Sequence, residues 1–275
     1  MLTLSIIAPV VTLSALGLFF GILLAISSKI FHVEQDERLP KVTEALPGAN
    51  CGGCGYAGCS NYASAVVAGQ APVTLCSVGG AAVGTKIAEI MGVDAGEQVR
   101  KVAHVNCRGG LNAKRKYQYE GISDCLAASK VAGGPLECQY GCLGFGTCEK
   151  VCPYDAIHVV NDVAVVDADA CKACGKCISA CPRKLIDLVA DTQDVFVNCS
   201  SHDRGPVVRQ ACEIGCIGCM LCQKTCKHDA IHVENNLASI DYSKCVNCGE
   251  CIDVCPRKLI SRASQTTAKT QHTDL

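Results

Sequence analysis

The stretch that decides the fold is Cys171-Lys-Ala-Cys174-Gly-Lys-Cys177-Ile-Ser-Ala-Cys181-Pro182, which recurs 74 positions later as Cys245-Val-Asn-Cys248-Gly-Glu-Cys251-Ile-Asp-Val-Cys255-Pro256. The flanks repeat with it, because DAIHV at 155–159 returns at 229–233 and CPRKLI at 181–186 returns at 255–260. A lone C-x2-C pair is a weak signal, since structural zinc sites use the same spacing. Two copies of C-x2-C-x2-C-x3-C followed by proline are typical of iron–sulfur ligation. The repeat therefore predicts two iron–sulfur units in tandem.

The cysteine content supports a metal protein. The chain has 24 Cys among 275 residues, only 4% aromatic residues and no Trp, which leaves a disulfide scaffold or a metal protein as its class. Disulfide scaffolds are typically short secreted chains, so the length argues against them. With 49% hydrophobic residues the chain is not a disordered polymer. A formal charge of −1 and few aromatics give no support to nucleic-acid binding.

Residues 2–28 contain no ionisable side chain and exceed the roughly 20 residues that cross a bilayer core. A cleaved signal peptide is the alternative, but its apolar core is about 7 to 15 residues long and follows a basic residue, which is missing here. We therefore expect a single transmembrane helix over 1–28. Lys29, Arg38 and Lys41 follow it, so the positive-inside rule predicts that the rest of the chain is cytoplasmic. That reducing compartment keeps thiols available as metal ligands.

A four-cysteine module follows, with Cys51-Gly-Gly-Cys54-Gly-Tyr-Ala-Gly-Cys59 and then Cys76. Glycines between thiolates suit a cubane cluster, because the backbone must wrap closely around a bulky inorganic core. Four-thiolate zinc is the alternative for this module alone. The repeat later in the chain favours iron and sulfide here as well.

The repeated run resembles that of the bacterial two-cluster ferredoxin, in which three cysteines hold one cluster and the fourth reaches the other. This resemblance implies four groups of ligands. They are Cys152 with Cys171, Cys174 and Cys177; Cys226 with Cys245, Cys248 and Cys251; Cys255 with Cys216, Cys219 and Cys222; and Cys181 with Cys142 and Cys148.

The last of these groups is incomplete, because the first copy has Phe145 where the second has Cys219. We expect Cys138 to supply the fourth thiolate. The alternative is a three-iron cluster that lacks the iron of the missing cysteine. A further departure is Lys227, which follows Cys226 where the other runs have proline.

Four cysteines then remain, namely Cys107, Cys125, Cys199 and Cys212. They flank the connectors of the two units, so folding can bring them together, and we expect them to hold a sixth 4Fe-4S cluster. The alternative is that they are unliganded buried thiols, which behave as small hydrophobic groups. Because Cys212 is the repeat counterpart of Cys138, these two cysteines are candidates to exchange roles.

The expected fold is α+β, with a transmembrane helix, a small helical four-cysteine domain and two ferredoxin-like two-cluster domains in tandem. We expect short paired strands around each DAIHV, and clusters that hold the domains together because metal binding is coupled to folding. The predicted boundaries are 1–28 for the transmembrane helix, 29–45 for a juxtamembrane linker, 46–106 for the four-cysteine domain, 107–134 for a connector, 135–190 and 212–262 for the ferredoxin-like domains, 191–211 for a second connector and 263–275 for a polar tail.

The order of parts, with the stretches Ala49-Asn-Cys-Gly-Gly-Cys-Gly-Tyr-Ala-Gly-Cys59, Cys142-Leu-Gly-Phe-Gly-Thr-Cys148 and Gly215-Cys-Ile-Gly-Cys219, resembles the B subunit of the Rnf-type ion-translocating electron-transport complex. The resemblance implies an inner-membrane protein that takes electrons from reduced ferredoxin and passes them to other redox subunits. It also implies that the complex couples ferredoxin oxidation and NAD reduction to pumping of sodium ions or protons.

The residues agree with a pure electron carrier, because the sequence has no dinucleotide G-x-G-x-x-G after a strand and no flavin or nucleophile signature. An iron–sulfur sensor or a cluster-assembly scaffold at the membrane is the alternative function. Basic residues are candidates to steer an acidic ferredoxin, although we favour the simpler interpretation that they are solvated faces. They are Lys114, Arg115, Lys116, Arg183, Lys184, Arg257 and Lys258. The repeated His158 and His232 are expected to be strand residues and not ligands.

Overall fold

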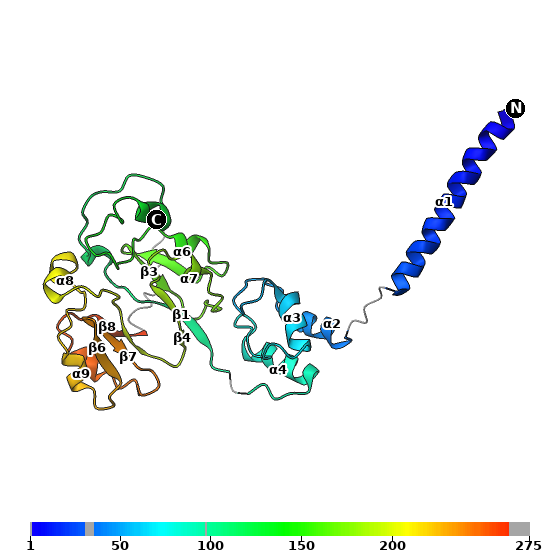
Figure 1. Ribbon diagram of the computed structural model, residues 1–275. Helices are drawn as coiled ribbons and strands as arrows, with labels where there is room; N and C mark the ends of the chain where they lie inside the picture. The colour runs from blue at the N-terminus through cyan, green and yellow to red at the C-terminus, as the bar shows by residue number, and fades with distance from the viewer. Residues whose placement is uncertain (1, 31–35, 97, 264–275) are drawn as a thin grey trace, which may run out of the picture.

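The computed structural model describes residues 2–30, 36–96 and 98–263. Along the chain it forms a long helix, α1 (Leu2–Ile30), then a small helical module, then a larger body of short strands and helices (Figure 1). The helix coincides with the segment predicted to span the membrane. Within the part of the chain that the structure describes, however, no helix has both the length and the apolar character needed to cross a membrane. The predicted membrane span is therefore not confirmed.

The helical module consists of α2 (Arg38–Ala45), α3 (Cys59–Val67) and α4 (Gly80–Met91). Its core is built from Val42, Tyr62, Val66 and Ile87, all at most 2% exposed. Tyr62 also ties the α3–α4 connection, because its hydroxyl donates to the Pro72 carbonyl at 2.8 Å and accepts from the Leu75 amide at 3.2 Å. Helix α2 packs into this core through Val42, although the sequence predicts a linker over 29–45.

The first ferredoxin-like unit, which we call unit 1, contains two antiparallel strand pairs. Strands β2 (Ile157–Val160) and β3 (Val163–Val166) form the hairpin expected at DAIHV, and β1 (Lys101–Val105) pairs with β4 (Ile186–Ala190). Short helices α6 (Thr147–Lys150) and α7 (Lys176–Ala180) carry Cys148 and Cys177. Ile157, Leu185 and Ile186 fill the core among the cysteines.

Unit 2 repeats this design. Strands β6 (Ile231–Glu234) and β7 (Leu237–Ile240) form its hairpin, and β5 (Val195–Val197) pairs with β8 (Ile260–Arg262). Helices α9 (Leu221–Thr225) and α10 (Glu250–Asp253) carry Cys222 and Cys251. The outer strands β1 and β5 come from segments predicted from the sequence to belong to the four-cysteine domain and to a connector.

An inserted segment, 106–137, separates β1 from Cys138, the first repeated cysteine of unit 1. It contains the 3-10 turn η1 (Gly110–Asn112) and helix α5 (Cys125–Lys130), and it faces helix α8 (Gly205–Ala211) of the unit 2 side. The Lys114 amide donates to the Ala211 carbonyl at 2.9 Å, and the Glu213 amide donates to the Asn112 carbonyl at 3.0 Å. The insertion therefore joins the two units through backbone hydrogen bonds.

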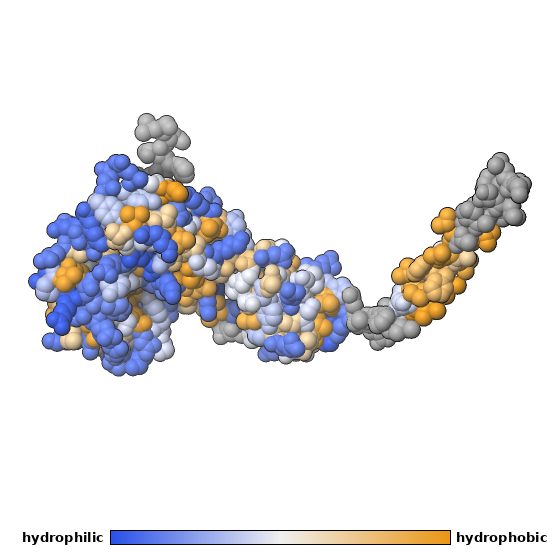
Figure 2. All heavy atoms as spheres, turned by 45° about the horizontal axis from the view of Figure 1, so that its top comes forward, coloured by the Kyte–Doolittle hydropathy of each residue, from blue (hydrophilic) through white to orange (hydrophobic). Residues whose placement is uncertain are grey.

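The two units also meet through β1 and β5. The buried His104 ring stacks on Phe196 with centroids 4.0 Å apart, and its Nε2 lies 3.2 Å from the Asn198 Oδ1. The Asn198 amide in turn donates to the Leu259 carbonyl and to the Ser261 hydroxyl, each at 2.9 Å. In the view of Figure 2 the surface of the larger body is mostly hydrophilic, whereas the coloured part of α1 is apolar.

Candidate iron–sulfur sites

The 24 cysteines, whose thiols are all free of disulfides, assemble into groups of four. Five groups each line a cavity of their own. We number the sites as follows: site 1 is Cys51, Cys54, Cys59 and Cys76; site 2 is Cys152, Cys171, Cys174 and Cys177; site 3 is Cys125, Cys142, Cys148 and Cys181; site 4 is Cys107, Cys138, Cys199 and Cys212; site 5 is Cys216, Cys219, Cys222 and Cys255. The remaining four cysteines, Cys226, Cys245, Cys248 and Cys251, are the repeat counterparts of the site 2 cysteines, and we call this set site 6.

Site 1 lies on the loop between α2 and α3 and on the loop that precedes α4. Gly52 and Gly55 have φ of 75° and 85°, a left-handed conformation that glycine adopts without steric cost, and this lets the loop curl around its thiols. Asn50 fastens the loop, because its side-chain oxygen accepts from the Cys59 amide at 2.9 Å. Burial raises the pKa of the Cys76 thiol, and the other three thiols of the site raise it further.

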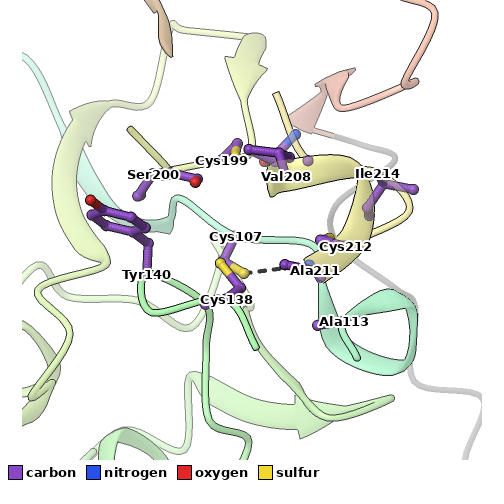
Figure 3. A pocket seen from close by; sticks show the side chains of 15 residues that line it. Cys107, Ala113, Cys138, Tyr140, Cys199, Ser200, Val208, Ala211, Cys212 and Ile214 are labelled. Atoms are coloured by element: carbon purple, nitrogen blue, oxygen red, sulfur yellow. Dashed lines mark hydrogen bonds between the residues drawn. The ribbon is translucent and has the colours of Figure 1, made fainter. Parts of the chain in front are cut away.

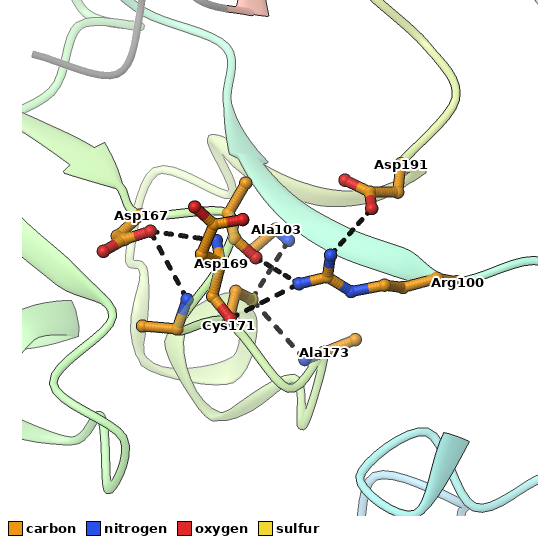
Figure 4. Close-up of polar contacts among 9 residues, drawn as sticks. Arg100, Ala103, Asp167, Asp169, Cys171, Ala173 and Asp191 are labelled. Carbon is orange, nitrogen blue, oxygen red and sulfur yellow. Dashed lines mark hydrogen bonds and ion pairs between the residues drawn. The ribbon is translucent and has the colours of Figure 1, made fainter. Parts of the chain in front are cut away.

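Site 2 is held by a network around the 167–173 loop (Figure 4). The Cys171 sulfur accepts hydrogen bonds from the amides of Ala103 at 3.4 Å and Ala173 at 3.5 Å. Arg100 binds the Asp191 carboxylate at 2.8 Å and the Ala168 carbonyl at 2.5 Å, so the start of β1 is fixed to this loop. Amide donors that point at cysteine sulfur stabilise negative charge on a cluster and tune its potential.

Site 6 is the repeat counterpart of site 2. The Ala230 amide donates to the Cys226 sulfur at 3.4 Å, as the Ala156 amide does to Cys152 at the same distance. Burial raises the pKa of the Cys251 thiol to about 12, and Cys248, Cys222 and Cys245 are the thiols that raise it further. Lys227, which replaces the usual proline, forms an ion pair with Glu250 at 2.8 Å.

Site 3 differs from the expected grouping. The cavity beside Phe145 is lined by Cys142, Cys148 and Cys181 as predicted, but its fourth cysteine is Cys125 and not Cys138. Helix α5 of the insertion brings Cys125 there, with its amide donating to the Thr147 hydroxyl at 2.7 Å. Phe145 packs instead on the Tyr119 ring, with centroids 5.1 Å apart. The thiol missing from the repeat is thus replaced from the insertion.

Site 4 contains Cys138 in place of Cys125 and lies between the two units (Figure 3). Unit 1 and its insertion provide Cys107 and Cys138, and the unit 2 side provides Cys199 and Cys212. Cys138 and Cys212 are repeat counterparts, and Cys107 and Cys199 each stand two residues after the equivalent strands β1 and β5. Site 4 therefore has approximate two-fold symmetry. The proposed exchange between Cys138 and Cys212 is not seen, because both line the same cavity.

The sequence did contain a signal for this grouping. Cys138 and Cys212 recur at the repeat distance, which favours equivalent roles in one shared site. The equivalence of Cys107 and Cys199 depends on the pairing of β1 and β5, which lies outside the repeated stretch. Burial raises the pKa of Cys107 to about 12 and that of Cys199 to about 11. A thiol must lose its proton to become a ligand, and the raised pKa makes that loss less favourable.

Sites 3, 4 and 5 are joined by direct contacts. The Cys142 amide of site 3 donates to the Cys107 sulfur of site 4 at 3.4 Å, and the Cys216 amide of site 5 donates to the Cys199 sulfur of site 4 at 3.3 Å. These two contacts are repeat equivalents. Helix α7 connects Cys177 of site 2 to Cys181 of site 3, and Cys222 of site 5 neighbours Cys251 of site 6. Sites 2 to 6 thus follow one another in a row.

The donors fit iron–sulfur clusters. Each site offers four soft thiol ligands from loops whose amides point at sulfur, which is the ligand set of 4Fe-4S clusters. A structural zinc ion, by comparison, holds its thiolates at about 2.3 Å. Within 2–30, 36–96 and 98–263 no group of three or more His, Cys, Asp or Glu side chains is arranged to hold a metal ion.

The basic and histidine residues singled out from the sequence lie mostly in structural roles. Arg257 donates to the Cys212 carbonyl at 2.7 Å, Arg183 donates to the Gly133 carbonyl, and Arg115 pairs with Asp162 at 2.6 Å. Lys114, Lys116, Lys184 and Lys258 are exposed. His158 and His232 lie in β2 and β6, where each ring contacts the carbonyl three residues earlier.

Comparisons with known proteins agree with this arrangement. Residues 46–78 match a family described as putative Fe-S cluster, residues 134–192 match the LdpA Fe-S cluster-binding domain, and residues 215–259 match the 4Fe-4S dicluster domain. The chain therefore contains iron–sulfur cluster-binding domains.

Several relatives cover nearly the whole chain. The B subunit of the Na(+)-translocating ferredoxin:NAD(+) oxidoreductase complex of Acetobacterium woodii is 49% identical over 94% of this chain and 78% of its own length. The B subunit of the ion-translocating oxidoreductase complex of Methanosarcina acetivorans is 40% identical over 92% of this chain and 97% of its own. The corresponding protein of the proton-translocating ferredoxin:NAD(+) oxidoreductase complex of Clostridium ljungdahlii is 45% identical over 92% and 90%.

Proposed function

Because the chain belongs to the family of B subunits of ion-translocating oxidoreductase complexes, we propose that it carries electrons from reduced ferredoxin to other redox subunits of such a complex. The complex would couple ferredoxin oxidation and NAD reduction to the movement of sodium ions or protons, the two ions named for the relatives.

One observation carries this proposal: four-thiol sites follow one another in a row, with backbone amides of one site bonded to sulfurs of the next. When bound, 4Fe-4S clusters supply one-electron chemistry. The residues around them hold the thiolates, direct amides at sulfur and exclude water. A sensor or an assembly scaffold needs only one accessible cluster, so a row of several sites in contact favours relay.

We propose six 4Fe-4S clusters, one for each of sites 1 to 6. Support comes from the division of all 24 cysteines into six groups of four. At site 3 the fourth thiol, Cys125, supports a four-iron cluster over the three-iron alternative. At site 4 four thiols face one cavity, which supports a cluster over unliganded thiols.

We also propose that α1 anchors the chain to the membrane, with all six sites on the cytoplasmic side. Residues 2–28 lack ionisable side chains, and Leu13, Leu18 and Leu24 on α1 are 71%, 67% and 66% exposed. Lys29, Arg38 and Lys41 support the sidedness. A full-length chain should remain in the membrane pellet after alkaline carbonate extraction, whereas a variant lacking residues 2–28 should be soluble. Release of the full chain by carbonate would refute the anchor.

The ferredoxin step is tested by anaerobic stopped-flow mixing of the purified chain with reduced ferredoxin. We expect the visible absorption of the chain to bleach as ferredoxin is oxidised, one electron being lost by ferredoxin for each one gained. A chain that dithionite reduces but ferredoxin does not would disprove ferredoxin as donor.

A further inference from the structure

The helical module touches unit 1 at one close backbone contact. Gly53 lies between Cys51 and Cys54 of site 1, and a Cβ atom placed on it would come within 2.9 Å of the Cys174 carbonyl oxygen and 3.3 Å of its Cα. Cys174 belongs to site 2. The ligand loops of two sites therefore meet backbone against backbone.

Space, and not backbone conformation, requires glycine at position 53. The neighbouring Gly52 and Gly55 have left-handed φ angles, whereas Gly53 does not. Any side chain at position 53 must push the two loops apart, because its Cβ would meet the rigid backbone of Cys174.

Tyr154 lies at the same place. Its side chain lines the cavity of site 2 together with Cys174. The ring therefore stands beside the loop whose backbone meets Gly53.

The repeat provides an internal comparison. The counterpart of Cys174 in unit 2 is Cys248, and the counterpart of Tyr154 is His228. Cys174 is half-buried, but Cys248 and His228 are exposed. The loop that the helical module covers in unit 1 is thus left open in unit 2.

We propose that the contact between Gly53 and Cys174, braced by Tyr154, is the junction through which electrons pass between site 1 and the row formed by sites 2 to 6. This inference rests on the proposed relay function. One electron crosses at a time, reduced ferredoxin being the ultimate reductant, and no bond is made or broken. Gly53 and Tyr154 are positioning residues that keep the two sites close, since electron transfer slows steeply as the gap widens.

The test uses the full chain with Gly53→Val, and Ala57→Val as its control. Ala57 is an exposed residue of the same loop, so its variant adds a comparable side chain away from the junction. Both proteins are fully reduced with dithionite, and their iron content and electron spin resonance spectra are recorded. We expect both to keep the iron of the parent, and only Gly53→Val to lose the magnetic coupling between sites 1 and 2.

Unchanged coupling in Gly53→Val with full iron content would overturn the junction. If Gly53→Val loses iron from site 1, the same measurement is made on Tyr154→Ala, because Tyr154 is not a cluster ligand. Lost coupling in Tyr154→Ala supports the junction, and retained coupling overturns it. Because dithionite reduces the chain without ferredoxin, this test gives its result even if ferredoxin is not the electron donor. Failure of the junction and failure of the ferredoxin step can therefore be told apart.

Discussion

At the scale of single residues, Cys125 completes a site that the repeat leaves with three thiols. Its helix lies in the insertion, 17 positions before Cys142, yet the hydrogen bond from its amide to Thr147 fixes it beside the Cys142–Cys148 loop. Cys138 is consequently free to join its repeat counterpart Cys212 in site 4. Each of these two cysteines, Cys125 and Cys138, therefore belongs to a different proposed cluster.

Double substitution tests this grouping. Cys125→Ala and Cys138→Ala should each remove about four irons per chain, and the double variant about eight, because the two thiols serve separate 4Fe-4S clusters. The control double variant, Cys125→Ala with Cys142→Ala, should remove only about four. Iron analysis of the purified proteins measures this, and a Cys125/Cys138 double variant that loses no more than either single variant would refute the assignment.

His104 gives the unit interface a pH dependence. Burial lowers the pKa of His104 to about 4 from the ordinary 6.5, although the Asn198 hydrogen bond opposes this. Because the unfolded chain binds the proton first, folded-state stability should decrease as the pH falls from about 6.5 towards about 4, by about 3 kcal/mol at most.

The expected result is a smaller loss of thermal stability between pH 7 and pH 5 in His104→Gln than in the parent, since glutamine does not titrate. The variant should be less stable at pH 7, because it loses the stacking on Phe196. Anaerobic melting curves at both pH values measure the difference. Equal losses in the two proteins would show that His104 does not carry the effect.

At the scale of elements, helix α5 shows how a short helix is made precise enough to carry a ligand. Asp124 caps its first turn, accepting from the Ala127 amide at 2.9 Å and from the Thr147 hydroxyl at 2.7 Å. Such a cap contributes about 1 kcal/mol, which matters for a helix of six residues. The same carboxylate therefore fixes both the helix and the residue that binds the Cys125 amide.

Replacing the cap should loosen site 3. We expect Asp124→Ala to destabilise the chain by about 1 kcal/mol and to speed the loss of iron from site 3 to a chelator. Ser123→Ala, at the exposed neighbouring position, should behave like the parent. Timed iron release with spin resonance of site 3 distinguishes them, and equal release rates in both variants would exclude a role for the cap.

The elements also show what sequence can predict. The hairpins at DAIHV follow from the local pattern. The module spacing predicts the cysteine set of site 1, and the resemblance to the two-cluster ferredoxin implies the sets of sites 2, 5 and 6. Strands β1 and β5 could not, because KVAHV and VFV acquire their partners only from β4 and β8, far along the chain. Sites 3 and 4 depend on those strands and on the unrepeated insertion. The cysteine spacing therefore led to a wrong prediction, with Cys138 in site 3 and Cys125 in site 4.

At the scale of the whole molecule, two units built to one plan share a symmetric site between them. Each unit has three cysteines in its buried core, whereas the helical module has one, Cys76, in a core centred on Tyr62 and Ile87. Cluster binding should therefore contribute more to the folding of units 1 and 2 than to α2, α3 and α4.

Iron removal tests this difference. After treatment with a chelator under oxidising conditions, we expect amide hydrogen exchange to become fast in β1 to β8 while α3 and α4 keep part of their protection. Mass spectrometry of exchanged peptides measures both regions in one sample. Retained protection of β1 and β4 in the iron-free chain would contradict the dependence of the units on their clusters.

Iron analysis and spin resonance of the anaerobically reduced, full-length chain test whether the six thiol sites form one continuous path. We predict about 24 irons per chain, from six clusters of four irons, and reduced clusters that couple magnetically to their neighbours along the row. An iron content far below that value, or reduced clusters that behave as isolated spins, would contradict it.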